Sequence, residues 1–490
     1  MFASTTSVAL VGVDPRPVRV EVHVGRGGNR FSLVGLPDTA VREAKERVQA
    51  ALASSGFEWP SRNVTISLAP ADLPKAGSTY DLPIALAVLA ATKIIPDACT
   101  RVVALGELAL DGSLRAPRGG LAAAQVAREL GVPALVPAGS YHEAALVAGA
   151  ELRPARSLAE AIDVATGNAT VPEVAEPQPS DAPTAAELSA VRGQATARRA
   201  LEIAAAGGHH LLLTGPPGSG KTMLARCLPG ILPSLDADGA LAAAQAWAAA
   251  GLTRNTKKLP PFRSPHHSIT LAALVGGGNG LPGPGEVTLA HHGVLFLDEL
   301  GEFPSHLLDA LRQPLEEGYV DVARRSGSVR FPSQMQLVAA SNPCPCGHAG
   351  DNRVPCRCSP RAVERYRRRL SGPLLDRFDL RVAVQSVAAD DLASEPSEPS
   401  AAVAARVAHA RTRQTGRGSL NAQLTRNALD EMEVEASAAT LLRGAFDTLA
   451  LTGRGWDRVR RIARTIADLA ESEPIAEGHM AEALALRGSW

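Results

Sequence analysis

The residues with the clearest chemistry in this 490-residue chain form a glycine-rich run that ends in a lysine and a threonine. The apolar stretch HLLLT at 210–214 precedes the run and the helical sequence MLARCL follows it, which is the context of a phosphate-binding loop. In such a loop backbone N–H groups wrap the phosphates, the lysine reaches the β and γ oxygens, and the threonine hydroxyl ligates Mg²⁺. A glycine-rich turn with only a structural role is the alternative. We therefore predict that ATP and Mg²⁺ are bound by Gly215, Pro216, Pro217, Gly218, Ser219, Gly220, Lys221 and Thr222.

An acidic pair follows a second apolar stretch. The sequence VLFL at Val294–Leu297 predicts a buried strand, and Asp298 and Glu299 come directly after it. At this place Asp298 would belong to the coordination shell of Mg²⁺. Glu299 would orient and deprotonate the attacking water. Surface acids at the end of a core strand are the alternative interpretation.

A third strand is predicted at Gln336–Ala340, with the sequence QLVAA, and it ends in Ser341 and Asn342. The amide of Asn342 would then lie beside the γ-phosphate, where it can position water. A polar residue after a strand is also a common turn former, so this prediction depends on the order of the three motifs.

Four of the six cysteines lie in one short segment. Their pattern is C-x-C, nine residues, and C-x-C, in an insertion at 344–358. Four thiolates could close around a tetrahedral Zn²⁺, which would stiffen a loop next to the nucleotide pocket rather than perform chemistry. The spacing differs from the commoner C-x₂-C, so His348 as a replacement ligand and free thiols remain alternatives. The predicted zinc ligands are Cys344, Cys346, Cys356 and Cys358.

Several elements must position these residues, and the length of the chain predicts two or three domains. Residues 1–168 mix strand and helix patterns and predict an α/β domain. A proline-rich and acidic linker follows at 169–185, and residues 186–387 carry the nucleotide motifs on a doubly wound parallel sheet. A second stretch with little sign of regular structure leads from there into 401–490. The helical periodicity of residues 401–490 predicts a small helical lid.

Charge and hydropathy restrict the partners. Fifty basic residues balance fifty acidic ones, so any contact with DNA or RNA must be local. The segment Met1–Val11 lacks a basic n-region, and no apolar run approaches the roughly 20 residues that a membrane helix needs. We therefore expect a cytoplasmic protein that does not associate with membranes.

Five motifs together make the chain resemble a known family. GPPGSGKTMLA, PHHS, LAHHGVLFLDELGEF, SNPCPCG and SGPLLDRFDL resemble the Mg-chelatase-like AAA+ ATPases of the YifB/ComM family, and the match covers nearly the whole chain. The resemblance implies a P-loop αβα core followed by a helical lid. It also implies that Arg377 is an arginine finger inserted into a neighbour's active site, so hydrolysis requires a ring, which in this family is expected to have six subunits. A salt bridge from Arg377 to Asp376 is the alternative.

Arg454, in TGRGWDRVRRIARTIADL, is similar to the sensor-2 arginine of the family, although a solvated helix face is also possible. The N-terminal segments KAGSTYDLPIAL and GELALDGSLRAPRGGL resemble a Lon-protease-like, ribosomal S5-like α/β domain. Peptidase chemistry of that type needs a serine and a second lysine where this chain has Thr79 and Ala122. We therefore expect a scaffold or a collar facing nucleic acid. Lys75, Arg115 and Arg118 could touch phosphates there, and a solvated surface charge is the alternative for each of them.

The sequence indicates the substrate less directly than it indicates the ATP site. YVDVARRSGSVRF at Tyr319–Phe331 predicts a β-hairpin that turns at Ser326-Gly327 and carries Arg324, Arg325 and Arg330. Family resemblance places this hairpin, with a glycine-rich insertion at Pro261–Pro284, at the pore of the ring. His266 and His267 of that insertion could alternatively bind zinc. The resemblance favours a DNA helicase or translocase similar to ComM proteins, which act on branched DNA in natural transformation. A chelatase motor subunit and a protein remodeller remain alternatives.

Overall fold

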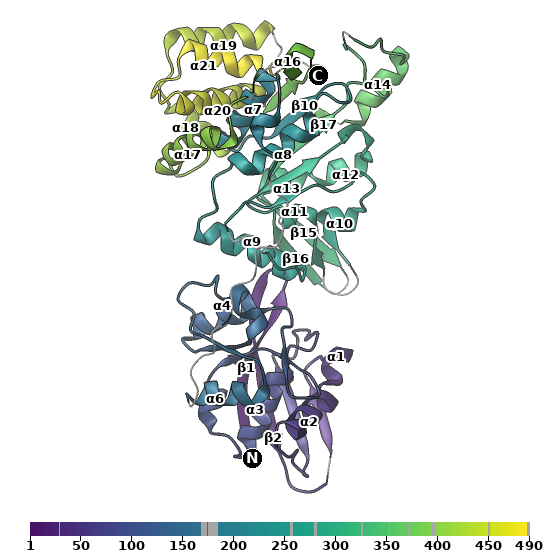
Figure 1. The fold of residues 1–490 in the computed structure, drawn as a ribbon, viewed down its shortest axis with the longest axis vertical. Coiled ribbons are helices and arrows are strands. Elements are labelled where there is room, and N and C mark those ends of the chain that lie inside the picture. Colours follow the sequence, from purple (N-terminus) through teal and green to yellow (C-terminus); the bar gives the residue numbers. More distant parts are fainter. Residues whose placement is uncertain are drawn as a thin grey trace.

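The computed structural model describes residues 1–28, 30–167, 174, 185–254, 258–278, 282–324, 327–351, 353–370, 372–387, 389–393, 395, 397–448 and 451–487. Figure 1 shows two lobes along the long axis of the molecule, with the N-terminal domain in the lower lobe and the nucleotide-binding motifs with the helical lid in the upper one. The linker predicted at 169–185 falls outside the described residues except for positions 174 and 185.

A seven-stranded sheet forms the centre of the N-terminal domain, in the order β3-β4-β2-β1-β5-β8-β9. The long strands β1 and β2 form an antiparallel hairpin, and α3 (DLPIALAVLAA) is buried along its whole length against them because nearly all of its residues are apolar. The strands are β1 (Phe2–Val11), β2 (Asp14–Val24), β3 (Phe31–Val34), β4 (Val64–Ala69), β5 (Val103–Ala104), β6 (Glu107–Leu108), β7 (Leu114–Arg115), β8 (Ala134–Pro137) and β9 (Leu152–Ala155). The helices are α1 (Thr39–Arg42), α2 (Ala44–Ser54), α3 (Asp81–Ala91), α4 (Gly120–Leu130), α5 (Tyr141–Ala144) and α6 (Leu158–Thr166).

The upper lobe contains a five-stranded sheet in the order β11-β14-β17-β10-β18, and each neighbouring pair is parallel. Because the strands are parallel, their carboxyl ends meet at one edge, where ligands bind in open α/β sheets. The α/β fold class predicted from the sequence is confirmed. The strands are β10 (Leu211–Thr214), β11 (Phe262–Arg263), β14 (Val294–Leu297), β17 (Gln336–Ser341) and β18 (Leu380–Ala383), and the helices before and between them include α7 (Ala195–Gly207), α8 (Lys221–Ile231) and α9 (Ala237–Ala249).

The predicted β-hairpin is formed by β15 (Tyr319–Arg324) and β16 (Gly327–Pro332). Gly327 pairs with Arg324, so Gly327 belongs to the strand rather than to the turn expected at Ser326-Gly327; Arg325 and Ser326 lie outside the described residues. The short elements around the hairpin are α10 (Leu271–Val275), β12 (Gly276–Gly277), β13 (Gly283–Pro284), α11 (Glu286–Leu289), α12 (Ser305–Ala310) and α13 (Arg312–Glu317).

The two lobes touch at two places. Gly12, in the turn between β1 and β2, lies so close to the β15–β16 hairpin that an added Cβ would be 2.4 Å from Cγ1 of Val329. On the other side, Leu121 and Ala124 of α4 share a buried apolar cluster with Ala244 of α9. The N-terminal domain is therefore joined directly to the hairpin.

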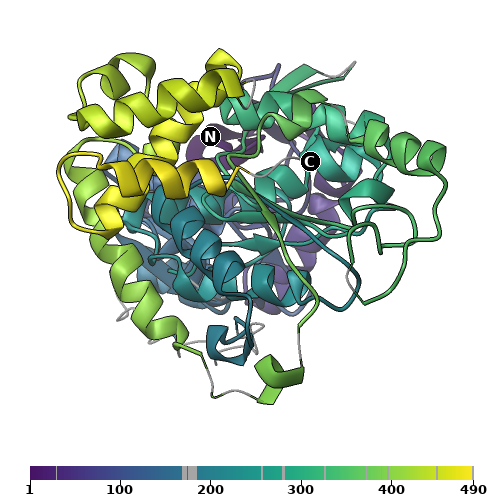
Figure 2. The same cartoon turned by 90° about the horizontal axis from the view of Figure 1, so that it is seen from above.

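The lid packs on the nucleotide-binding core through one continuous apolar cluster that includes Val459, Ile462 and Ile466 of α20 and residues of α7. Seen from above, the lid lies along one side of the core and α14 projects on the opposite side (Figure 2). The helices of this part are α14 (Pro360–Arg369), α15 (Gly372–Leu375), α16 (Ala389–Ala393), α17 (Ser400–Gly416), α18 (Arg426–Asp430), α19 (Ala436–Thr448), α20 (Gly453–Leu469) and α21 (Glu477–Ala485). Among the described residues, no helix is both long and apolar enough to cross a membrane.

Candidate active site

The loop between β10 and α8 encloses the side chain of Lys221. Its ammonium group donates to the backbone oxygens of Gly215 (2.7 Å) and Pro216 (2.8 Å) and lies 3.3 Å from Oδ1 of Asn342. Burial lowers the pKa of Lys221, while the nearby carboxylate of Asp298 opposes this change. Because the loop that ends at Lys221 follows β10 and Asn342 follows the adjacent strand β17, the phosphate loop and the third motif meet at one point.

Glycine is required at the start of this loop. A Cβ at Gly215 would lie 2.0 Å from the backbone oxygen of Val384, which follows β18. No other residue type fits there without moving the adjacent strand, so the loop can form only with glycine at this position.

Thr222 and Asp298 form a direct contact across the sheet edge. The hydroxyl of Thr222 donates to Oδ2 of Asp298 over 2.7 Å, and Oδ1 of Asp298 accepts from the backbone N–H of Glu299. Hydroxyl and carboxylate oxygens are ligands that Mg²⁺ uses in nucleotide sites. These two residues therefore fit the magnesium-binding role predicted for them from the sequence.

Glu299 adopts a left-handed backbone conformation, with φ of 52°, which is unusual for a residue other than glycine. Its Oε2 lies 3.3 Å from Nδ1 of His267. His267 follows the short edge strand β11, which pairs with β14, and its ring lies against His266 and near Phe303. The contact brings the two residues together at the same sheet edge.

The sequence does not predict the contact between His267 and Glu299. It indicates instead that His266 and His267 belong to a pore insertion or, alternatively, bind zinc. Within the described part of the chain, the only cluster of three or more potential metal ligands is formed by cysteines, so the structure gives the two histidines no partners for a metal site. No local spacing signal links positions 267 and 299, because the pairing depends on β11.

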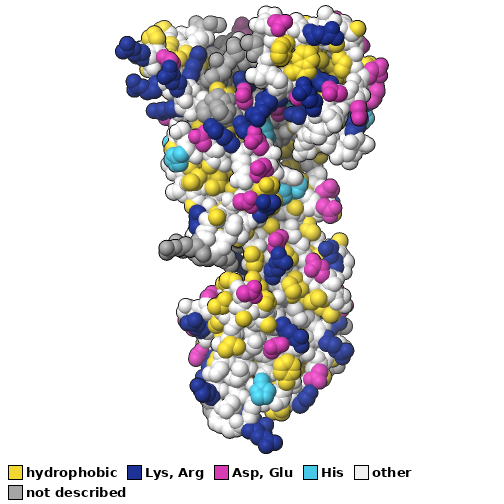
Figure 3. Space-filling view, turned by 180° about the vertical axis from the view of Figure 1, so that it is seen from behind, with side chains coloured by type: hydrophobic (Ala, Val, Ile, Leu, Met, Phe, Trp, Pro, Cys, Tyr) yellow, Lys and Arg dark blue, Asp and Glu magenta, His cyan; other side chains and the backbone are white. Residues whose placement is uncertain are grey.

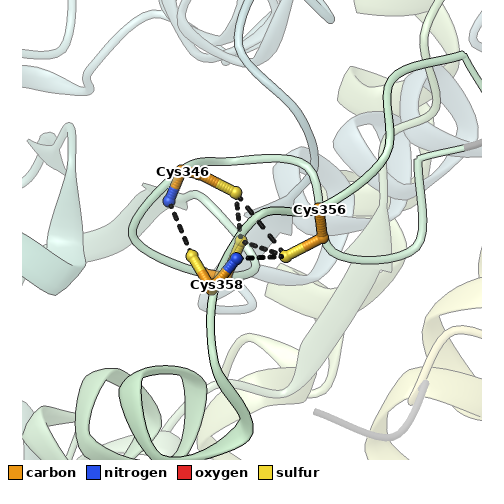
Figure 4. Close-up of side chains that lie close together, drawn as sticks. Cys346, Cys356 and Cys358 are labelled. Carbon is orange, nitrogen blue, oxygen red and sulfur yellow. Dashed lines mark hydrogen bonds between the residues drawn. The ribbon is translucent and has the colours of Figure 1, made fainter.

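The four cysteines of the 344–358 insertion converge (Figure 4). The Sγ atoms of Cys344, Cys346 and Cys356 lie 3.4 to 3.7 Å apart, and Sγ of Cys358 accepts from the backbone N–H of Cys346. Tetrahedral Zn²⁺ with Zn–S bonds of about 2.3 Å separates its sulfur atoms by about 3.8 Å, so the donor set fits zinc. Backbone N–H groups of His348 and Arg357 lower the pKa of Cys346 to about 6.

His348, the alternative zinc ligand, is engaged elsewhere. Its Nδ1 lies 2.9 Å from Oδ2 of Asp351. The cysteine insertion also touches the phosphate loop directly, since a Cβ at Gly347 would lie 2.5 Å from Cδ of Pro217. The cysteine insertion and the loop at 215–222 are therefore in van der Waals contact.

Arg377 lies at the opposite edge of the sheet from the phosphate loop. It precedes β18, whose first residue pairs with Leu211 at the start of β10, whereas the phosphate loop follows the last residue of β10. A strand of this length separates the two edges by about 13 Å. Burial lowers the pKa of Arg377, whose guanidinium hydrogen-bonds to Glu316 at the end of α13.

Arg454 reaches the same carboxylate from the lid. Its Nη1 lies 4.0 Å from Oε1 of Glu316, and its side chain is 67% exposed. The alternative pairing of Arg377 with Asp376 is not observed, because Asp376 forms its ion pair with Arg381. Both predicted arginines thus lie together, away from the phosphate loop of their own chain.

The N-terminal basic residues differ from the expectation of a phosphate-binding collar. Lys75 is only 1% exposed and donates to the backbone oxygen of Pro70, so it cannot contact phosphate, and that prediction was wrong. Arg118 lies against Gly251 of the other lobe. Arg115 is exposed and pairs with Glu107.

The hairpin arginines are also partly engaged. Arg330 forms two hydrogen bonds to Asp321, its direct cross-strand neighbour, and lies over the ring of Tyr319. Arg324 lies near Gly277 of the glycine-rich insertion, and Arg325 is outside the described residues. The charge of Arg330 is therefore balanced within the hairpin.

Comparison with known proteins gives matches along most of the chain. Three family profiles match: "Magnesium chelatase, subunit ChlI" at 187–392, "Subunit ChlI of Mg-chelatase" at 20–140, and "Magnesium chelatase, subunit ChlI C-terminal" at 397–487. YifB of Escherichia coli is 43% identical, over 98% of this chain and 96% of its own. Competence protein ComM of Haemophilus influenzae is 40% identical, over 99% and 97%. The magnesium-chelatase 38 kDa subunit of Cereibacter sphaeroides is 26% identical over 41% of this chain and 58% of its own.

Proposed function

Because the chain belongs to the YifB/ComM family of Mg-chelatase-like AAA+ ATPases, we propose that it is a ring-forming motor that uses ATP to move along DNA. The specific activity would be that of a helicase or branch-migration translocase in recombination or natural transformation. The observation that carries the proposal is the similarity to ComM over 99% of the chain. ComM is named a competence protein, and competence is the state in which a cell takes up DNA.

In the proposed mechanism, one sheet edge holds the nucleotide. Lys221 would exchange its contacts with loop carbonyls for the β and γ oxygens of ATP, and Thr222 and Asp298 would hold Mg²⁺. The magnesium ion would supply positive charge to the phosphates. Glu299 would take a proton from the attacking water while Asn342, which touches Lys221, orients it.

The proposed ring follows from the position of the arginines. Arg377 and Arg454 share Glu316 at the edge about 13 Å from their own phosphate loop, too far to reach their own nucleotide directly. In a closed hexameric ring, each pair would instead face the γ-phosphate of the neighbouring subunit. A fixed guanidinium there would neutralise charge in the transition state and link adjacent sites.

The four cysteines would hold a structural zinc ion beside this site. Their sulfur atoms converge without other described ligands, and zinc would keep the insertion folded rather than take part in hydrolysis. Since Gly347 lies against Pro217, the zinc-held loop would support one wall of the phosphate loop.

A chelatase-type motor and a protein-remodelling motor are the alternatives. The similarity to the 38 kDa chelatase subunit covers only 41% of this chain, whereas the similarity to ComM includes the N-terminal domain. We therefore favour the DNA motor, acting in the cytoplasm.

Measurement of ATP hydrolysis with single-stranded, duplex and forked DNA tests the proposal. A DNA motor should hydrolyse ATP faster with at least one of these, and forked DNA should be unwound only when ATP is present. If the purified protein has basal ATPase activity but neither binds DNA nor is stimulated by it, the DNA function is wrong and the alternatives gain support.

A further inference from the structure

Helix α14 carries a dense group of arginines. Five of its ten residues are arginine and one is acidic, although basic and acidic residues balance over the whole chain. Lys and Arg side chains gather over this helix at the upper left of Figure 3. The arginines, all exposed, are Arg361, Arg365, Arg367, Arg368 and Arg369.

Within the described part of the chain, two of these arginines form ion pairs with acidic residues. Arg368 pairs with Glu364 of the same helix, and Arg369 lies 3.8 Å from Glu302. Among the residues that the structure describes, no carboxylate forms an ion pair with the other three, Arg361, Arg365 and Arg367. The helix therefore presents positive charge that no described carboxylate fully neutralises.

The inner face of α14 is fixed to the nucleotide-binding core. Tyr366 is buried, and Ser341, the residue before Asn342, lies near its hydroxyl. An added Cβ at Gly301, shortly after Glu299, would lie 2.2 Å from the same hydroxyl. Leu370, just after the helix, joins the apolar cluster that contains Leu300.

The other end of the helix is attached to the cysteine insertion. Ser359 caps the helix by accepting from the backbone N–H of Ala362, and Cys358 directly precedes it. An open depression of about 680 Å³ lies here, lined by Cys358, Pro360, Val363, Glu364, Arg367 and Arg368. Both ends of α14 are therefore held, so the helix itself has a fixed place on the surface.

We propose that the outer face of α14 binds the sugar-phosphate backbone of nucleic acid; this rests on the proposed DNA function and names its contact surface. Arg361 and Arg365 are one helical turn apart, about 6 Å along the axis, and each guanidinium can hold a phosphate through two N–H groups. The face offers no exposed large apolar side chain, whereas stable protein interfaces need an apolar centre and nucleic-acid interfaces are polar and positive. Nucleic acid therefore fits the surface better than a protein partner does.

The attachment of α14 to the core would link phosphate binding at this helix to the active site. Tyr366 joins the helix to the strand end that carries Asn342 and to the turn after Glu299. Binding of the phosphate backbone to α14 would then influence the positions of Asn342 and Glu299, the two residues proposed to orient and deprotonate water. The contact connects nucleic acid with the γ-phosphate side of the active site.

The test is charge reversal in the full-length protein. Arg361→Glu with Arg365→Glu should weaken binding of a fluorescein-labelled single strand of about 30 nucleotides by about tenfold or more and reduce its salt dependence. Basal ATPase activity and the mass of the ring should not change. The matched control is Arg426→Glu with Arg443→Glu, two exposed arginines of the lid, which should bind DNA like the wild type.

Three outcomes would overturn the inference. Wild-type affinity in the α14 variant, with the wild type itself binding DNA, would remove this surface while leaving the DNA function intact. Loss of the ring in the α14 variant would make the surface a contact between subunits. Absence of DNA binding by the wild type would reject the proposed function, and this surface with it. The neutral pair Arg361→Gln and Arg365→Gln repeats the test if charge reversal prevents folding.

Discussion

The imidazole Nδ1 of His267 lies 3.3 Å from Oε2 of Glu299, although the two residues belong to different segments of the chain. Glu299→Gln should retain ATP binding and stop turnover, because the amide cannot take a proton from water.

His267→Ala should lower kcat by about tenfold with little change in KM, since the carboxylate of Glu299 loses the partner that orients it. Steady-state ATPase assays with nucleotide-binding measurements separate these effects.

The control for this pair is His267→Asn, whose amide N–H can still donate to the carboxylate. It should retain most of the activity that His267→Ala loses. Wild-type kcat in His267→Ala would show that the contact does not support hydrolysis, and rapid turnover by Glu299→Gln would remove Glu299 from the role of base.

Arg377 should act on a neighbouring subunit. Arg377→Ala should lower kcat by about a thousandfold, in the range expected for loss of an arginine finger. When it is mixed with Glu299→Gln, some interfaces combine an intact Glu299 from one variant with an intact Arg377 from the other. ATPase activity should therefore recover in part, although each variant alone is inactive.

Mass measurement of the mixture must confirm that mixed rings form. No recovery in confirmed mixed rings would mean that Arg377 acts within its own chain. Asp376→Ala is a useful control because Asp376 pairs with Arg381 rather than with Arg377, and this variant should keep most of the activity.

The part of the site made by contiguous motifs could be predicted from the sequence. Lys221, Thr222 and Asp298 meet because parallel strands end at one edge, and that arrangement follows from strand patterns and local loop chemistry. The β-hairpin was also predictable, because two short alternating runs flank a turn.

Contacts that depend on tertiary pairing could not be predicted. The proximity of His267 to Glu299 requires the two-residue strand β11, which is too short to give a periodic signal. The burial of Lys75 and the partner of Arg330 depend on neighbours that only the folded chain brings close. A charged residue in a motif therefore indicates chemistry, but its surroundings decide whether it is free to act.

Gly347 should connect the cysteine insertion to nucleotide binding. Its φ is 84°, and a Cβ there would press on Pro217, so Gly347→Ala should lower ATP affinity by about tenfold through displacement of the loop. Gly350→Ala is the matched control, because Gly350 has φ of 76° in the same insertion but no atom near its Cβ position. Equal affinities of the two variants would show that backbone strain alone, and not contact with Pro217, accounts for any change.

His291 should make the protein less stable in acid. Burial, followed by repulsion from His292, lowers its pKa to about 3, so the folded chain keeps His291 neutral while the unfolded chain takes up a proton below its ordinary value of 6.5. Stability is thus fully present above about pH 6.5 and falls by about 1.4 kcal/mol per unit as the pH drops towards 3. Thermal unfolding at pH 7.5 and 5.5 should show a smaller loss for His291→Asn than for the wild type, whereas exposed His306→Asn should behave like the wild type. Parallel losses in all three proteins would contradict this origin.

Zinc should be present at about one ion per chain, as atomic absorption on purified protein can measure. Replacement of Cys344, Cys346, Cys356 and Cys358 by serine should abolish the zinc content, because a hydroxyl does not replace a thiolate as ligand. Replacement of buried Cys99 and Cys227 by alanine should leave it unchanged, since neither belongs to the cluster. The four-serine variant should also bind ATP more weakly, because the loop that carries Gly347 would no longer hold its place against Pro217. A folded wild-type preparation without zinc would exclude the metal site, and zinc loss with unchanged ATP affinity would show that the ion stabilises only its own insertion.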